Sequence, residues 1–587
     1  MNSIDRRGPG THTTVPVFSS LVGYRRAWLT ADLVAGLTVW AVLVPEALAY
    51  ATIAGVSPVV GLYAAVPALA LYAAFGSSRH LVVGPMAASA ALSAAAVADV
   101  AARSGADFTE LTIGLALVTG VLGVLAGVAR LGFLASFISE PVLKGFIIGL
   151  ALTILVGQLP KLIGVPKTEG DFFEQSWGLI DHLGDAHGWT LLVGAMSLAI
   201  VFGFRRFVPA VPGSLVAVAV GIAAAAVFEL DDKGVAIVGT IDAGLPSMGL
   251  PDLGWSDYTD LTASAVGILL VGFAEGLGAA KTYAKRDHYT VDPNRELLGL
   301  GAANVGAGLT SGMVVNGSLS KTAVNGAAGA HSQASGLLVA VLTVVTLLFL
   351  TGLFEHLPEA TLAAVVIAAV IELVDVKALV RLWNIWTASL AAIYGRVARA
   401  DLIAAVAALA GVLVFDTLPG LFIGIAVSVL LMVYRASRPH VAVLGRTSSQ
   451  DRWVDVDRHP DASPTAGVLV VRPESGLFYA NADNVHAAIR ELLKPDTHAV
   501  VLDLESVPVI DVTAAAMLME LDEELARAGV RLLIAREVGQ IRDVLRHAGA
   551  ERLTEHVHPS VDRAVQTAAR SRAQQPRRSD PTRSDDG

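Results

Sequence analysis

Long stretches without charge decide what this chain can fold into. Residues Leu297–Ser320 and Ser332–Phe354 contain no ionisable side chain. Over all 587 residues the charged share is 16% and the mean hydropathy is +0.61, whereas a soluble domain averages about 25% charged residues. A chain so poor in charge has too little polar surface to fold in water. The sequence therefore predicts a protein that is embedded in a membrane.

Apolar segments recur through the first three quarters of the chain, and a spanning helix needs about 20 such residues. Fourteen candidate spans lie at about 32–54, 58–76, 85–100, 111–129, 132–158, 188–205, 207–228, 258–280, 296–312, 318–330, 332–354, 358–374, 400–416 and 419–435. With the N-terminus inside, the inside loops hold arginines such as Arg205 and Arg206, and the long outside loops 160–187 and 230–257 are acidic. This charge bias agrees with the positive-inside rule. We expect a multi-pass protein of the cell membrane with both termini in the cytoplasm.

The pattern changes after about residue 465, where short apolar strands alternate with amphipathic helices. Such alternation predicts a small α/β domain, and the polar end of the chain has a composition typical of disorder. We divide the chain into a cytoplasmic N-terminal segment (1–27), a transmembrane transport domain (28–438), a linker (439–464), the α/β domain (465–567) and a disordered tail (568–587).

Two of the candidate spans are short and rich in small and polar residues: "VGPMAASAALSAAA" (83–96) and "NGSLSKTAVNGAAGA" (316–330). Each is third in a group of seven, and because seven is odd the second group must be inverted relative to the first. Interrupted helices at matching positions of an inverted repeat indicate a transporter's binding site. A half-helix that starts inside the membrane presents free N–H groups and a positive dipole end, which suit an anion. The alternative is an ordinary loop, or a packing helix of small residues.

Lys321 lies inside the second of these segments, where a charge costs about 2.5–3.5 kcal/mol on insertion scales. We therefore expect Lys321 to be functional or paired. The candidate partners are Glu46 and Glu275, which lie in the first span of each group of seven, so that the inverted repeat places both near one centre. The alternative is that either glutamate reaches the membrane surface or pairs locally.

Three segments resemble signatures of the SulP sulfate permease family: "VPEALAYATIAGVSPVVGLYAAVPALALYAAFGSSRHLVVGPMAA" (44–88), "NRELLGLGAANVGAGL" (294–309) and "NGSLSKTAVN" (316–325). Near the C-terminus, "VIDVTAAAML" (509–518) resembles a STAS domain, the module shared with anti-sigma factor antagonists. The resemblance implies an α-helical membrane protein with a seven-plus-seven inverted repeat, a core domain and a gate domain. It also implies alternating access by an elevator-like movement.

The resemblance also implies where the substrate binds, namely between the N-termini of spans 3 and 10. The residues assigned to substrate binding are Glu46, Tyr50, Met86, Ala87, Ser318, Leu319, Ser320 and Lys321. The resemblance assigns the coupling of transport to a cation to Glu275. One helical turn on either side of Glu275 stand Val271 and Ala279, which offer no oxygen for sodium. This favours protons, carried by Glu275 first and Glu46 second. In the STAS domain Thr513 lies in the loop where anti-sigma factor antagonists carry a serine that becomes phosphorylated. Thr513 is therefore a candidate for regulatory phosphorylation.

The leading functional hypothesis is proton-coupled import of a small inorganic oxyanion, with sulfate first, bicarbonate second and dicarboxylates third. The alternatives are an uncoupled exchanger, a channel-like conductor or voltage-responsive motor, and a nucleobase permease. We expect no enzyme activity, because no nucleophile and base are suitably placed, and no cofactor, metal or nucleic acid partner. The expected partners are the anion with its proton, the lipid bilayer, a second copy in a homodimer, and a cytoplasmic protein that binds the STAS domain.

Overall fold

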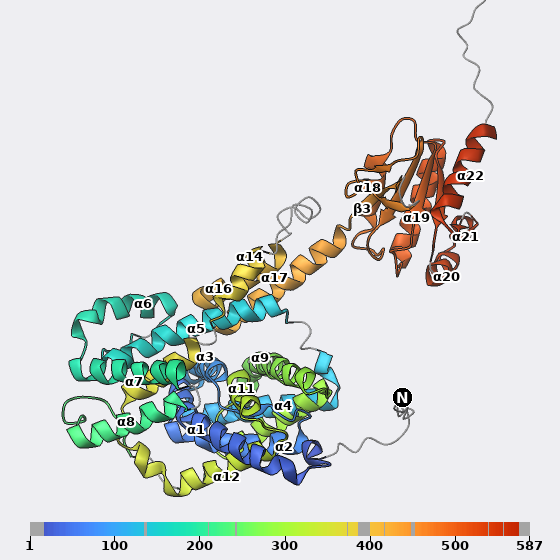
Figure 1. The fold of residues 1–587 in the computed structure, drawn as a ribbon. Helices are drawn as coiled ribbons and strands as arrows, with labels where there is room; N and C mark the ends of the chain where they lie inside the picture. The colour runs from blue at the N-terminus through green and yellow to red at the C-terminus, as the bar shows by residue number, and fades with distance from the viewer. Residues whose placement is uncertain are drawn as a thin grey trace, which may run out of the picture. The chain divides into compact units, whose positions relative to one another are not determined.

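The chain folds into two compact units (Figure 1). The computed structural model describes residues 17–574 except 134–137, 169, 209–210, 241–243, 372–373, 385–398, 416, 448–451, 538 and 556. Within these limits, residues up to 384 together with 401–428 form the first unit, and the remainder belong to the second.

Helices dominate the first unit, and one group of them packs around α10, which contacts both α2 and α4. This group comprises α1 (Leu29–Ile53), α2 (Pro58–Phe75), α3 (Ala87–Ser104), α4 (Phe108–Val128), α9 (Trp255–Arg286), α10 (Pro293–Leu309), α11 (Leu319–Ala327) and α12 (Ala334–Phe349). Glycines allow the closest contact, since a Cβ at Gly123 of α4 would lie 2.8 Å from the Cα of Gly301 in α10. Close backbone approach through small residues is typical of membrane helices.

A second group of helices contains α13, which contacts α5, α7 and α8, and it belongs to the first unit except for Ala400 and the end of α17 after residue 428. The group comprises α5 (Glu140–Ile163), α6 (Phe172–Asp181), α7 (Gly188–Phe207), α8 (Gly213–Phe228), α13 (Glu359–Ile371), α14 (Val376–Asn384), α16 (Ala400–Phe415) and α17 (Thr417–Ser437). Short 3-10 helices are η1 (Ser19–Leu21), η2 (Arg26–Trp28), η4 (His182–Asp185) and η5 (Thr351–Phe354).

Each of the fourteen predicted spans overlaps one of these helices. Seven of the described helices are long and apolar enough to cross a membrane, and α8, α12, α13 and α16 are shorter apolar helices. The number of spans therefore stays a prediction, although a helical membrane fold is clear. Two details differ from the expectation: α5 starts at Glu140 instead of near 132, and the helix α6 lies in a segment predicted to be a loop.

The second unit contains a mixed sheet with helices on both faces (Figure 1). Its strands are β3 (Val441–Thr447), β4 (Trp453–Asp455), β5 (Ala462–Ser463), β6 (Val468–Pro473), β7 (Ala499–Asp503), β8 (Arg531–Ala535) and β9 (Val557–His558), in the order β4-β3-β6-β7-β8-β9, with β5 paired to β3. Its helices are α18 (Ala482–Leu492), α19 (Val512–Arg527), α20 (Gly539–His547), α21 (Glu551–Thr554) and α22 (Val561–Gln574). Strands β6 to β9 run parallel. The predicted α/β domain is confirmed.

The boundaries of this domain differ from the prediction at both ends. Strand β3 lies in the expected linker, because its alternating residues join the sheet with Val441 opposite Pro473. At the other end α22 runs to Gln574 and buries Ala568, so the first residues of the expected tail are helical. Residues 575–587 of that tail and 1–16 of the N-terminal segment lie outside the described residues.

Candidate functional site

Two short strands pair inside the first unit and define the site. Strand β1 (Val82–Gly84) precedes α3, and β2 (Asn316–Ser318) precedes α11. They pair antiparallel, with Val83 opposite Gly317, and all six residues are buried. Since each strand leads directly into a helix, α3 and α11 leave this strand pair at opposite ends. Both segments form helices that follow buried strands, so the loop alternative is wrong; their start inside the membrane stays a prediction.

Buried polar side chains hold the strand pair, and sequence reasoning missed them. The hydroxyl of Thr322 accepts a hydrogen bond from the Val82 backbone N–H at 3.0 Å, and Asn325 Nδ2 donates to the His80 carbonyl at 2.9 Å. Gln333 Nε2 donates to the carbonyls of Ser78 and Leu81 at 3.0 and 2.9 Å. The sequence signal that could have revealed Asn325 and Gln333 was a side-chain amide in an otherwise apolar segment. A buried amide needs hydrogen-bond partners, so it indicates a nearby polar contact.

A carboxylate fixes the chain that leads into β1. Glu296 of α10 is fully buried and accepts hydrogen bonds from the Tyr72 hydroxyl at 2.6 Å and from the Ser77 hydroxyl at 2.6 Å. It also accepts the backbone N–H groups of Ser77 and Ser78 at 2.8 and 3.1 Å. These four bonds tie α10 to the end of α2 and to the turn before the site.

Lys321 lies at the centre of the site with only 1% of its surface exposed. Its Nζ donates a hydrogen bond to the Pro85 carbonyl at 3.0 Å and lies 2.8 Å from Glu46 Oε2. The contact with Glu46 is an ion pair by distance, but its angles fall outside hydrogen-bond geometry. The amine also lies 4.9 Å from the ring centroid of Tyr50, within range of a cation–π interaction. Lys321 thus joins α1, the start of α3 and α11.

The other predicted binding residues line the starts of the two helices. Met86 and Ala87 are buried at the start of α3. Ser318 caps α11, because its hydroxyl accepts the Lys321 backbone N–H at 3.3 Å. Leu319 and Ser320 are exposed, in contrast to Lys321 beside them. The start of α11 is therefore not covered by the rest of the chain, while the lysine amine is enclosed.

Glu275 does not join Lys321, contrary to the expectation that both glutamates meet it. Among the described residues only Glu46 forms an ion pair with Lys321, and Glu275 Oε2 is buried without a hydrogen-bond partner. The reason is the face of α9 that meets β2, where Gly276 lies against Gly317. Successive residues of a helix point about 100° apart, so Glu275 is turned away from that contact.

This contact gives a testable prediction about packing at the site. A Cβ at Gly317 would lie 2.8 Å from the Cα of Gly276, which is backbone and cannot rotate away. At Gly84, in the same strand pair, a Cβ would meet only Leu43 Cδ1 at 3.7 Å. We expect Gly317→Ala to displace β2, at about 1–3 kcal/mol of overpacking, and to lower transport at least several-fold. The matched Gly84→Ala variant should transport normally; equal effects of the two, measured as initial uptake rates, would contradict this geometry.

A cavity of about 470 Å³ lies along α3. It is lined by Thr52, Ile53, Ala91, Ala94, Ala95, Ala98, Thr153, Ile154, Gly157, Gln158, Lys161, Lys167, Gly170, Asp171, Phe172, Gln175, Val412, Leu413 and Thr417. Its lining begins about one turn after the start of α3, at Ala91. Lys161 and Lys167 of the predicted outer loop line it, and Lys161 Nζ lies 3.2 Å from Glu359 Oε2.

Thr513, the predicted phosphorylation site, lies in the first turn of α19 and is exposed. The turn is already capped by Asp511, whose Oδ1 accepts the Ala514 N–H at 2.8 Å and whose Oδ2 accepts the Tyr479 N–H at 2.8 Å. Phosphorylation of Thr513 stays a prediction.

Comparison with known proteins gives two family matches. Residues 29–395 match the Sulfate permease family and residues 459–564 match the STAS domain. The chain is 36% identical over 553 residues to a protein of Mycobacterium tuberculosis (strain ATCC 25618 / H37Rv) named probable sulfate transporter, covering 93% of this chain and 96% of the relative. It is 32% identical over 558 residues to probable sulfate transporter 4.2 of Arabidopsis thaliana, covering 91% and 80%.

Solved structures share the fold. The murine solute carrier 26 family member A9 anion transporter in its inward-facing state matches with a TM-score of 0.85 at 22% identity, over 96% of this chain and 97% of that one. The transmembrane domain of the cyanobacterial bicarbonate transporter BicA matches with a TM-score of 0.57 at 21% identity, over 69% and 98%. The predicted fold class, a helical membrane domain followed by an α/β STAS domain, is confirmed.

Proposed function

This chain belongs to the sulfate permease family, whose members are transporters and not enzymes, and we propose that it is a secondary active importer of a small inorganic oxyanion coupled to protons. Sulfate comes first among the substrates, because relatives at 36% and 32% identity are named sulfate transporters. The observation that carries the proposal is the buried amine of Lys321 where two half-helices start.

The charges around the strand pair suit a dianion. The N-terminus of a helix acts as about +0.5 of an elementary charge, so two such ends and Lys321 sum to about two positive charges. The first N–H groups of α3 and α11 have no acceptor within their helices. We assign anion contacts to the backbone at Met86, Ala87 and Leu319, and to the hydroxyls of Ser318 and Ser320.

Glu46 links anion binding to a proton. While Glu46 is ionised, its carboxylate lies 2.8 Å from Lys321 Nζ and cancels one positive charge of the site. The remaining charge of about +1 suits a monovalent anion such as bicarbonate, whereas sulfate needs the full charge of about +2. Protonation of Glu46 restores the charge of about +2. Binding of a proton therefore raises the affinity for sulfate, and by linkage binding of sulfate raises the affinity for the proton.

Glu275, ranked first from the sequence, comes second as a proton carrier in this proposal, because Glu46 and not Glu275 forms the ion pair with Lys321 among the described residues. The Oε2 of Glu275 is buried without a hydrogen-bond partner among the described residues. A proton can therefore bind this oxygen without breaking an existing hydrogen bond. Val271 and Ala279, one turn away on either side, are buried and apolar. Sodium prefers several oxygen ligands, and these two positions supply no side-chain oxygen, so we assign Glu275 to protons.

The remaining proposals concern assembly and movement. We assign the group around α10 to the core domain, which moves like an elevator, and the group around α13 to the gate domain. Both termini lie in the cytoplasm, and two copies form a homodimer. The STAS domain then serves regulation or partner binding.

The substrate can be identified by uptake into proteoliposomes under an inward proton gradient. Labelled sulfate, bicarbonate and succinate are offered separately, with nucleobase as a control from another substrate class. We expect sulfate to accumulate against its gradient and to do so in the absence of sodium. Accumulation of bicarbonate alone would exclude sulfate as the substrate, and equilibration without accumulation would exclude coupling.

A truncated chain tests whether the STAS domain contributes to the anion site. All residues of the site, from Glu46 to Lys321, lie in the first unit, and α17 ends at Ser437. We therefore expect a chain ending at Arg438 to bind sulfate with an affinity within a few-fold of the full chain, although expression and dimerisation can change. Binding is measured by calorimetry on monodisperse protein, and complete loss in folded truncated protein would contradict this expectation.

A further inference from the structure

Helix α6 (Phe172–Asp181) is an amphipathic helix between α5 and α7, which are both long and apolar enough to cross a membrane. Its start is fixed by a capping box. Asp171 Oδ1 accepts the Glu174 N–H at 2.8 Å, and Glu174 Oε2 accepts the Asp171 N–H at 3.1 Å. Such reciprocal bonds define the helix start and therefore the direction of each face.

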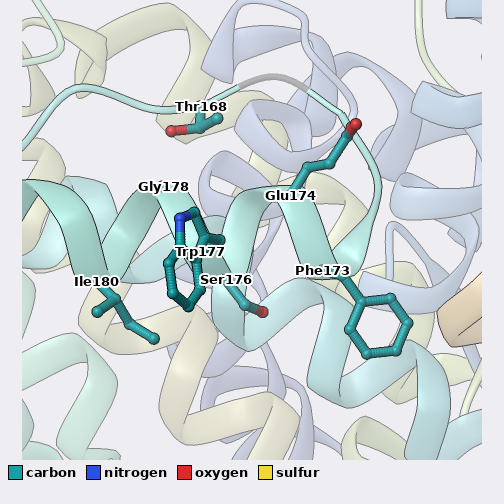
Figure 2. A pocket seen from close by; sticks show the side chains of 7 residues that line it. All are labelled: Thr168, Phe173, Glu174, Ser176, Trp177, Gly178 and Ile180. Atoms are coloured by element: carbon teal, nitrogen blue, oxygen red, sulfur yellow. The ribbon is translucent and has the colours of Figure 1, made fainter.

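One face of α6 is apolar and uncovered. Phe173, Trp177 and Ile180 recur at the i, i+4, i+7 spacing and fall within about 60° of one another around the helix. They are 54%, 73% and 59% exposed. They line a hollow together with Thr168, Glu174, Ser176 and Gly178, and Figure 2 shows the three apolar side chains along one side of the helix with Glu174 directed away from them.

The other faces of α6 have different surroundings. Phe172 and Gln175 line the 470 Å³ cavity beside α3, so this face of α6 packs toward the protein. Glu174 and Asp181 lie at about 100° and 80° around the helix from Phe173, and both are exposed. The apolar stripe is thus not part of the cavity wall, and acidic side chains border it on one side.

The surroundings of α6 in the chain identify what covers the stripe. The connections from α5 to α6 and from α6 to α7 are short, which keeps α6 close to the membrane that these two apolar helices are expected to cross. Exposed apolar residues continue from α6 into α7, at Leu183, Trp189 and Leu192. Tryptophan is typical of the membrane–water boundary, and helices with an apolar face and a polar face lie in that boundary.

We infer that α6 is an interfacial anchor whose stripe of Phe173, Trp177 and Ile180 lies in the bilayer at the boundary between headgroups and acyl chains. The anchor is hydrophobic and not electrostatic, because the polar face of α6 carries acids and no lysine or arginine. Insertion should therefore be insensitive to salt and to anionic lipid. Since the same helix lines the cavity beside α3, the bilayer would hold one wall of that cavity in place.

The absence of cysteine from the chain allows a direct test with single-cysteine variants. Trp177→Cys and Ile180→Cys probe the stripe, and Asp181→Cys, about 100° around the helix from Ile180, serves as the control. Each is labelled with a small fluorophore in full-length protein in phosphatidylcholine vesicles. We expect a lipid carrying a shallow nitroxide to quench position 180 at least twofold more than 181, and position 177 more than 181. Aqueous iodide should show the reverse order, and neither order should change with salt.

A second measurement avoids cysteine replacement on the stripe. Trp177→Phe keeps an aromatic side chain, and the difference in tryptophan quenching by brominated lipid between wild type and this variant isolates Trp177. We expect wild type to lose more fluorescence. Strong iodide quenching at positions 177 and 180, no loss of lipid quenching in Trp177→Phe, or a disulfide between two copies of the unlabelled Trp177→Cys variant would overturn the anchor. The last result would assign the stripe to a second copy.

Discussion

Replacement of Lys321 by alanine is expected to weaken sulfate binding by about 10-fold to more than 100-fold, because hydrogen bonds to charged groups contribute about 1.5–3 kcal/mol. Lys321 supplies the only full positive charge that the structure places at the strand pair among the described residues. The rate of uptake at subsaturating sulfate should fall by the same factor as the affinity for sulfate. Lys321→Arg keeps the charge and should be much milder, although the larger guanidinium must fit where Nζ is enclosed. Binding is measured by calorimetry and uptake in proteoliposomes.

The control must separate lost anion binding from misfolding. Removal of one partner of a buried ion pair leaves the other charge uncompensated, at about 3–5 kcal/mol. The double variant Lys321→Ala/Glu46→Gln removes both charges and should recover thermal stability without recovering sulfate binding. Unchanged sulfate affinity in folded Lys321→Ala protein would refute the assigned role of this residue.

The second large effect is expected at the two glutamates. Glu46→Gln removes the charge that pairs with Lys321, so sulfate binding should become almost independent of pH, and accumulation driven by a proton gradient should be lost. Glu275→Gln, which mimics the protonated acid, should still bind and exchange sulfate but should no longer accumulate it. Exchange is measured with sulfate on both sides of the membrane, and accumulation with a proton gradient.

Glu229, an exposed glutamate at the end of α8, provides the matched control. Glu229→Gln should accumulate sulfate as wild type does. Full pH-driven accumulation by both Glu46→Gln and Glu275→Gln, or accumulation that requires sodium at constant pH, would show that protons are not coupled through these acids.

Much of the fold could be predicted because apolar length and charge placement are local properties of the chain. The positions of the helices followed from apolar segments, and the strand-to-helix alternation gave the second unit. Helix α6 was missed because its ten residues are too few for a span, although Phe173, Trp177 and Ile180 carry the helical spacing. Strand β3 was missed because its role depends on pairing with β6, which is distant in sequence.

The site was predictable to the extent that a membrane charge is unusual. Lys321 and Glu46 each interrupt apolar sequence, and the structure brings them within 2.8 Å. Glu275 interrupts apolar sequence in the same way, but the face it takes on α9 depends on the glycine contact of Gly276 with Gly317, which no local pattern reveals. The bonds of Thr322, Asn325 and Gln333 likewise depend on a chain crossing that forms only in the folded protein.

The most direct test of coupled sulfate and proton binding is a count of protons taken up as sulfate binds. Calorimetric titration of the purified chain near neutral pH, in two buffers of different ionisation enthalpy, gives this number from the difference in heat. We predict uptake of about one proton per sulfate bound through Glu46, and none in Glu46→Gln. If the wild type binds sulfate without taking up a proton, the account is contradicted.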